Sequence, residues 1–210
     1  GPDGSICTAE LDDTWQDIQD TAAYHYDTST DCSFTTFVGY EWTGGPVTAV
    51  GGGVLEVQNM HRNVLFKNSI VPAAPYSYLD DGYPENLWDA LQTECLDLDD
   101  PNGECDAFTI PHNSNLSQGR MFGLTLPNGS PYGLPKAKQR RQFEPLIEIM
   151  QHKGQSECLA SSPDELCNFE ALQWGHVAAA FLGSTTPKVE GTVRDALKQG
   201  LGGHGLGYNP

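Results

Sequence analysis

The chain has 210 residues, of which 38% are hydrophobic, so it is long enough and apolar enough to build one domain with a sizeable core. Its charge is one-sided: 11 lysines and arginines stand against 28 aspartates and glutamates, giving a formal net charge of −17 at pH 7. This balance argues against nucleic acid and anionic membrane surfaces as partners, and the lack of a long apolar run argues against a membrane span. An anionic small substrate remains compatible with it, because bound divalent cations would invert the local potential.

The first half of the chain predicts one helix and two strands. Apolar residues recur at helical spacing through residues 10–26, and acidic residues crowd the first turn, which predicts a helix. Residues 34–42 and 63–67 are rich in β-prone side chains and predict strands. The Gly-rich residues 44–53 are expected to form no regular element, and residues 72–84 are expected to form a loop.

The second half predicts further short elements. Helices are expected over residues 85–95, 136–142 and 192–201, the last of them stopped by two glycines. Residues 107–111 and 146–151 are short apolar runs and predict buried strands. Because the predicted strands are short, apolar and separated by helices or long loops, the pattern favours an α/β fold with a parallel sheet buried on both faces.

The cysteines indicate disulfide bonds. The chain has six of them, which fall into three local pairs: Cys7 and Cys32, Cys95 and Cys105, Cys158 and Cys167. None of the intervals has the spacing of a zinc knuckle, and an even number in close pairs is typical of a protein from an oxidising compartment, secreted or periplasmic. Six reduced thiols in a cytosolic enzyme are the alternative. The sequence does not fix the connectivity, so nearest-neighbour pairing is a hypothesis based on loop closure.

Four strings place a Glu or a His at or beside the end of a predicted strand. They are FVGYEWTG (37–44), MHRNVLF (60–66), FTIPHNSN (108–115) and PLIEIMQHKGQSE (145–157). Carboxylates and imidazoles at the ends of separate strands are how an α/β barrel collects metal ligands. The candidate ligands are Glu41, His61 and His112, with Glu148, His152 and Glu157 as further candidates.

Glu41 and His61 each have a competing interpretation. Glu41 ends a β-prone run, and since a buried unpaired carboxylate is very costly we expect it at a rim, either on a metal or in a salt bridge. His61 opens a strand, as a ligand or as a hydrogen-bonded histidine. Arg62, beside it, is a possible substrate contact for a phosphate or sulfate oxygen, or else a surface ion pair.

His112 follows Pro111, which cannot continue a central ladder, so the strand must stop there and His112 must lie in the turn. If His112 is a ligand, Asn113 and Asn115 become candidate substrate contacts or donors to the ligands. The alternative is a polar turn without a ligand.

These strings resemble the polymerase-and-histidinol-phosphatase (PHP) superfamily. The resembling segments are Gly39-Tyr40-Glu41, the apolar strand after His61, Ile110-Pro111-His112 and Ile147-Glu148-Ile149. More closely, the chain resembles a PHP-related family of secreted bacterial proteins labelled as a domain of unknown function, number 3604. That resemblance covers nearly all of the chain and includes the wording YEWT, HRNV, IPHNSN and GTVRDALKQGL.

The resemblance implies a single PHP-like domain over residues 1–210, folded as a partial or distorted (β/α)7 TIM-like barrel and forming the middle part of that barrel. It implies that Glu41, His61 and His112 bind a divalent metal, Mn, Zn or Fe, as part of a cluster in the full-length protein. The His-x-His, Asp-His and Asp-x-His motifs of such proteins are not in this chain. The expectation is therefore an internal fragment or, alternatively, a degenerate member.

The function expected on this basis is that of a metal-dependent hydrolase. It would cleave a phosphate or sulfate ester of a small anionic molecule through a metal-bound hydroxide, with activity only in the complete protein. The alternative is a non-catalytic binding or structural domain with a degenerate metal site. No serine-nucleophile elbow or phosphate-binding glycine loop offers a competing enzyme class. The sequence makes no prediction of oligomeric state.

Overall fold

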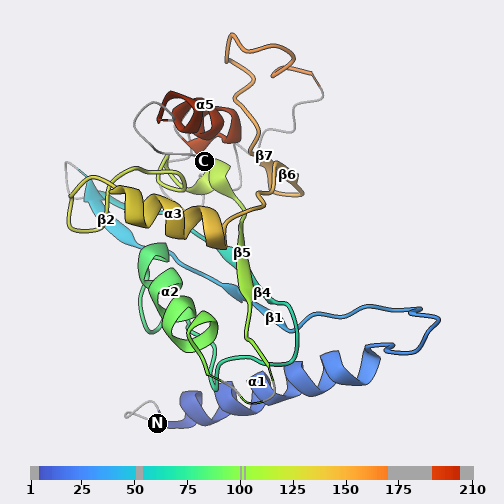
Figure 1. Cartoon of the computed structure of the whole chain (residues 1–210). Helices are drawn as coiled ribbons and strands as arrows, with labels where there is room; N and C mark the ends of the chain where they lie inside the picture. The colour runs from blue at the N-terminus through green and yellow to red at the C-terminus, as the bar shows by residue number, and fades with distance from the viewer. Residues whose placement is uncertain (1–4, 51–53, 100, 102, 170–190, 204–210) are drawn as a thin grey trace.

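The structure is a computed structural model that describes residues 5–50, 54–99, 101, 103–169 and 191–203 (Figure 1). The helix α1 runs along one end of the molecule, α5 lies at the other end, and the strands β1, β4 and β5 lie between them (Figure 1). The elements are α1 (Ser5–His25), β1 (Gly39–Trp42), β2 (Val47–Val50), β3 (Val54–Val57), β4 (Arg62–Phe66), α2 (Pro84–Leu91), the π-helical turn η1 (Gln92–Leu96), β5 (Ala107–Pro111), the 3-10 turn η2 (Ser114–Leu116), α3 (Leu134–Phe143), β6 (Met150–Gln151), β7 (Gly154–Gln155) and α5 (Val193–Gly203).

The predicted parallel sheet and TIM-like (β/α)7 barrel are wrong. The central sheet has the order β1-β4-β5, and both neighbouring pairs are antiparallel. β2 pairs with β3 and β6 with β7, also antiparallel, so the described residues contain neither a parallel pair nor a closed barrel. The burial of β4 and β5 gives the physical reason: side chains alternate between buried and half-buried, as in a sheet with a core on one face only.

β1 to β4 form one long bent hairpin. The register that pairs Gly39 with Leu65 continues into β2 and β3, where Val47 pairs with Val57. Between the two ladders, the Met60 amide donates to the Gly44 carbonyl at 2.8 Å. The Gly-rich segment expected to lack structure therefore contains β2. At Gly44 a Cβ would collide with the ring of Trp42, so the bend requires glycine for this close approach.

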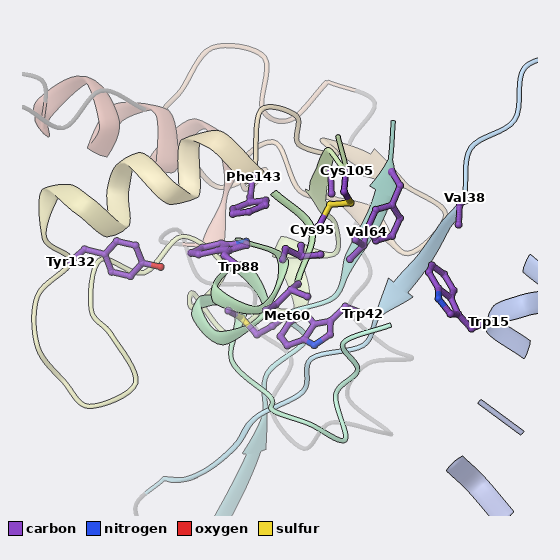
Figure 2. Close-up of a cluster of buried hydrophobic side chains, with 14 residues drawn as sticks. Trp15, Val38, Trp42, Met60, Val64, Trp88, Cys95, Cys105, Tyr132 and Phe143 are labelled. Carbon is purple, nitrogen blue, oxygen red and sulfur yellow. A yellow bond between two sulfur atoms is a disulfide. The ribbon is translucent and has the colours of Figure 1, made fainter. Parts of the chain in front are cut away.

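The core lies on one face of the central sheet. Trp42, Val64 and Phe66 point into it from β1 and β4 and are fully or almost fully buried. Helix α1 contributes Trp15, whose ring meets the Phe66 ring edge-on at 5.9 Å, and whose indole donates to the carbonyl of Pro72 at 3.0 Å. Figure 2 shows Trp15, Trp42 and Val64 together with Trp88 of α2, Phe143 of α3 and the Cys95–Cys105 bridge. The sheet is thus covered by α1, α2 and α3 on this face.

A charged network crosses this core. The fully buried Arg62 donates from Nε to Oε1 of Glu144 at 2.5 Å, and Arg140 donates to the other carboxylate oxygen at 2.9 Å. The two guanidinium groups each lie 5.7 Å from the centre of the Trp88 ring. One carboxylate therefore ties the end of α3 to the start of β4.

Two of the three predicted disulfides are confirmed. Cys95 pairs with Cys105 in the core, and Cys158 pairs with Cys167. Cys32 is exposed and has a free thiol, so the predicted bridge to Cys7 is wrong; the Cys7 side chain lies outside the described residues. Two disulfides fit an oxidising compartment. No helix within the described ranges has both the length and the apolar character needed to cross a bilayer.

Most predicted elements are confirmed with shifted ends, and two are wrong in part. Helices occur at α1, α2, α3 and α5, and strands at β4 and β5. Of the predicted strand 34–42 only β1 forms, although Val38, just before it, still accepts a hydrogen bond from the Phe66 amide at 3.0 Å. Of the predicted strand 146–151 only β6 forms, and β3 and β7 were not predicted from the pattern. The strands that do form bring the candidate ligands to one edge.

Candidate metal centre

The antiparallel order of the sheet brings three candidate ligands to one edge. Glu41 lies near the carboxyl end of β1, His61 immediately before the amino end of β4, and His112 immediately after the carboxyl end of β5. In an antiparallel sheet these three ends meet at the same edge. The side chains also share one face, because Glu41 is paired with Asn63, two residues after His61.

The three side chains lie close enough to share an ion. Glu41 Oε1 lies 2.8 Å from His61 Nδ1 and 3.4 Å from His112 Nε2. One ligand atom from each residue lies within 4.8 Å of the other two. The imidazole rings stand almost perpendicular, at 83°, with their centres 6.1 Å apart. Their predicted convergence at one edge is confirmed.

The turn after β5 orients His112. Its Nδ1 lies 3.3 Å from the carbonyl oxygen of Ile110 and donates to it, and Nε2 lies on the side of Glu41, where it would supply a lone pair to a bound ion. A ligand histidine commonly uses its second nitrogen in this way. Asn113 follows with φ of +63°, a left-handed conformation that asparagine tolerates, and its side-chain oxygen accepts a hydrogen bond from Gln151.

The pKa shifts at the site favour the ligand protonation states. Burial raises the pKa of the Glu41 carboxyl, but the hydrogen bond and charge of His61, with His112, outweigh it and hold the pKa below its ordinary value. Burial lowers the pKa of His61; the hydrogen bond and charge of Glu41 oppose this, and electrostatic repulsion from His112 and Lys153 adds to the lowering. At neutral pH Glu41 is therefore ionised and His61 neutral, as metal binding requires.

The donor set fits a divalent transition metal. Two imidazoles and one carboxylate are the protein ligands of hydrolytic zinc sites, and the same set serves Fe(II). The Glu41 side chain is 47% exposed and that of His112 9%, so the site is anchored on one side and open on the other. An ion there would keep free coordination positions for solvent or a substrate, which is the mark of a reactive rather than a structural site.

The three candidate substrate contacts lie in different surroundings. Arg62 belongs to the buried network with Glu144 and is fully buried, on the face of β4 opposite to the site. Asn113 is also fully buried, and its side-chain nitrogen Nδ2 has no hydrogen-bond partner among the described residues. Asn115 donates to the carbonyl of Lys153 at 3.0 Å. Only the two asparagines therefore stay beside the ligands.

The further ligand candidates do not join this group. Glu148 is half-buried and its amide donates to the carbonyl of Pro111 at 3.2 Å. His152 is exposed at the turn between β6 and β7. Glu157 is paired with Arg194 of α5 at 2.7 Å. Within the described part of the chain, the cluster of possible ligands around Glu41 consists of three residues.

Lys153 is the basic residue that the structure adds to this region. It follows His152 in the turn between β6 and β7, and its charge acts on His61. A single lysine in a polar turn carries no signal in the sequence, because surface lysines are common. Only the packing of the hairpin against the turn after β5 reveals its position.

The comparisons place the chain in a family. Residues 3–210 match the family described as protein of unknown function (DUF3604). The chain belongs to this family. No curated protein and no solved structure matches it. The DUF3604 assignment agrees with the resemblance drawn from the sequence, and it brings no activity with it, so the function has to be inferred from the site.

Proposed function

We propose that the chain is a metal-dependent hydrolase that acts on a phosphate or sulfate ester and is related to the PHP superfamily. The observation that carries this proposal is the convergence of Glu41, His61 and His112, with ligand atoms within 4.8 Å of one another, at an open edge of the sheet. The order of these three donors along the chain is the part of the PHP resemblance that supports it. The two disulfides support a secreted or periplasmic location.

The three ligand residues have different roles in the site, set by how deeply each is buried. A bound divalent ion, Mn, Zn or Fe, supplies Lewis-acid activation of water and of the ester oxygen. His112, fixed by the Ile110 carbonyl, sets the inner side of the site. His61 and the more exposed Glu41 close the outer side, and Glu41 supplies the negative charge that holds a cation in place.

Metal binding is tested first, without reference to a substrate. The chain should bind about one Mn²⁺ or Zn²⁺ per molecule, measured by calorimetry on metal-free protein. His112→Ala and Glu41→Gln should each weaken binding by roughly tenfold or more. His152→Ala and Glu148→Gln are matched controls from outside the cluster and should change the affinity by less than about twofold. Equal losses in both sets of variants would show that Glu41 and His112 are not the ligands.

Hydrolysis is tested second, with a panel of phosphate and sulfate monoesters and diesters in the presence of each metal. Turnover should need the metal, disappear with a chelator, and fall by about 100-fold or more in His112→Ala. One competing function is that of a non-catalytic binding domain. It is favoured by the number of donors, since the three possible ligands among the described residues hold a single ion and no cluster. Metal binding without turnover on any ester, in the chain and in the full gene product, would support that function instead.

A further inference from the structure

The hairpin formed by β6 and β7 is fastened to the turn that carries His112. Asn115 donates from Nδ2 to the carbonyl of Lys153 at 3.0 Å, and its Oδ1 accepts a hydrogen bond from the Ser156 hydroxyl at 3.1 Å. Gln151 donates to the side chain of Asn113. These three bonds join both arms of the hairpin to Asn113 and Asn115, one and three residues after His112, so the hairpin tip keeps a fixed place beside the site.

Lys153 sits at this tip. It is half-buried, and among the described residues it makes no ion pair with a carboxylate. Its carbonyl is held by Asn115, three residues after His112, so its side chain starts beside the turn that carries this ligand. Arg62 cannot take this role, because Glu144 holds it in the core.

A cation at this position is unfavourable for the site as described so far. A lysine ammonium beside this edge repels a metal ion held by Glu41, His61 and His112. Its position is explained when the site also binds an anion, since the lysine and the metal ion then attract the same negative group from two sides. A lysine ammonium is suited to this task as a point charge for phosphate or sulfate oxygens.

We propose that Lys153 binds the anionic group of the substrate, a tetrahedral phosphate or sulfate oxyanion, beside the Glu41–His61–His112 site. Asn115 acts as a positioning residue, because it holds the backbone of Lys153. This inference rests on the proposed function and adds to it the residue that recognises the anion. The acidic surface elsewhere repels anions, so the contribution of one lysine to their binding should be large.

The test measures two affinities on the full chain. Mn²⁺ binding is measured first; inorganic phosphate and, separately, sulfate are then titrated into the Mn²⁺-loaded protein. Lys153→Gln should weaken binding of the preferred anion by about tenfold or more, and Lys153→Arg should restore most of it. Mn²⁺ affinity in Lys153→Gln should be unchanged or higher, because a repulsive charge has been removed. Lys138→Gln, at an exposed lysine of α3, is the matched control and should alter neither affinity.

The outcomes separate this inference from the proposed function. If Lys153→Gln binds Mn²⁺ and both anions as the unmodified chain does, the assignment of Lys153 is wrong while the metal site stands. If Lys153→Gln loses Mn²⁺ affinity, the lysine supports the fold of the site and the anion assignment is likewise overturned. If the unmodified chain binds no Mn²⁺, Zn²⁺ or Fe²⁺, the proposed function fails and takes this inference with it.

Discussion

His61 and His112 face each other across β4 and β5, although neither belongs to a strand. The register that pairs Arg62 with Pro111 continues by one residue, and the His112 amide donates to the carbonyl of His61 at 3.2 Å. Directly opposed residues of an antiparallel pair point to the same face. The two imidazoles therefore meet because of ladder pairing, and a shift of one residue in register would separate them.

The buried network should respond unequally to loss of its members. Glu144→Ala leaves the fully buried Arg62 without its carboxylate and should cost about 3–5 kcal/mol of unfolding free energy. Arg62→Met should cost less, because Arg140 still neutralises Glu144 and the methionine fills part of the space. Chemical denaturation measures both. The control is Asp106→Asn in the exposed pair with Lys67, expected to change stability by about 1 kcal/mol or less. A larger loss in Arg62→Met than in Glu144→Ala would contradict this account.

The bend at Gly44 should tolerate no side chain. Gly44→Ala places a methyl group against the Trp42 ring and should destabilise the fold by about 1–3 kcal/mol. The adjacent Gly45→Ala is the control, since its added carbon would come no closer than 3.8 Å to any neighbour. Thermal unfolding of the two variants provides the comparison, and equal stability would show that the bend adjusts to the methyl group without cost.

The disulfides predict a specific pattern of reactivity. In the folded, non-reduced protein an alkylating reagent should label Cys32, and peptide mapping should recover the linked pairs Cys95–Cys105 and Cys158–Cys167. Replacing Cys95 and Cys105 together with alanine should cost about 2–4 kcal/mol, because a chain constraint and core packing are both lost. The matching double replacement of Cys158 and Cys167, away from the main core, should cost less. Labelling of Cys95 before Cys32 would refute this pattern.

The contact between α2 and α3 should depend on pH. Burial raises the pKa of Asp89, but hydrogen bonds from Lys136 and Gln139 outweigh it and lower the pKa below its ordinary value of 3.8. A lowered pKa in the folded state gives stability above the unfolded pKa that disappears as the pH falls through the folded one. Because the group is mostly exposed, Asp89→Asn should cost no more than about 1 kcal/mol at pH 7.

The unfolding free energies of the unmodified chain and of Asp89→Asn should therefore converge as the pH is lowered past 3.8. Urea unfolding at a series of pH values measures both. The exposed Asp13→Asn is the control and should give no such convergence. A difference between Asp89→Asn and the unmodified chain that persists at the acidic end would show that the effect does not come from the charge of Asp89.

The positions of the candidate ligands already indicated an antiparallel sheet, although the pattern of helices and strands favoured a parallel one. Glu41 lies near the carboxyl end of its strand and His112 follows its strand, whereas His61 precedes its own. In a parallel sheet His61 would lie at the opposite edge, so convergence of the three required β4 to run against its neighbours. Apolar runs alone cannot give this result, because short buried strands look alike in parallel and antiparallel sheets.

Other features depend on long-range packing and could not be predicted locally. Arg62 follows His61 in the chain, yet alternation along β4 turns it to the other face, where its partner Glu144 is 82 residues away. In contrast, residues 107–111 were predicted with the bounds that β5 has, because a β-prone apolar run ends there at a proline. The position of Lys153 depends on hydrogen bonds from Asn115, 38 residues earlier, and leaves no mark in the sequence around it.

The separation of the three donors along the chain also bears on how the protein folds. Glu41 and His61 are 20 residues apart within one hairpin, whereas Glu41 and His112 are 71 residues apart and meet only after β5 has docked. Hairpins close in microseconds, but distant pairings must overcome a larger loop-closure entropy. A partly folded chain that has formed the hairpin alone would offer a metal ion two donors, and the third would arrive last. Metal affinity would then report completion of the sheet, and a bound ion would slow its opening.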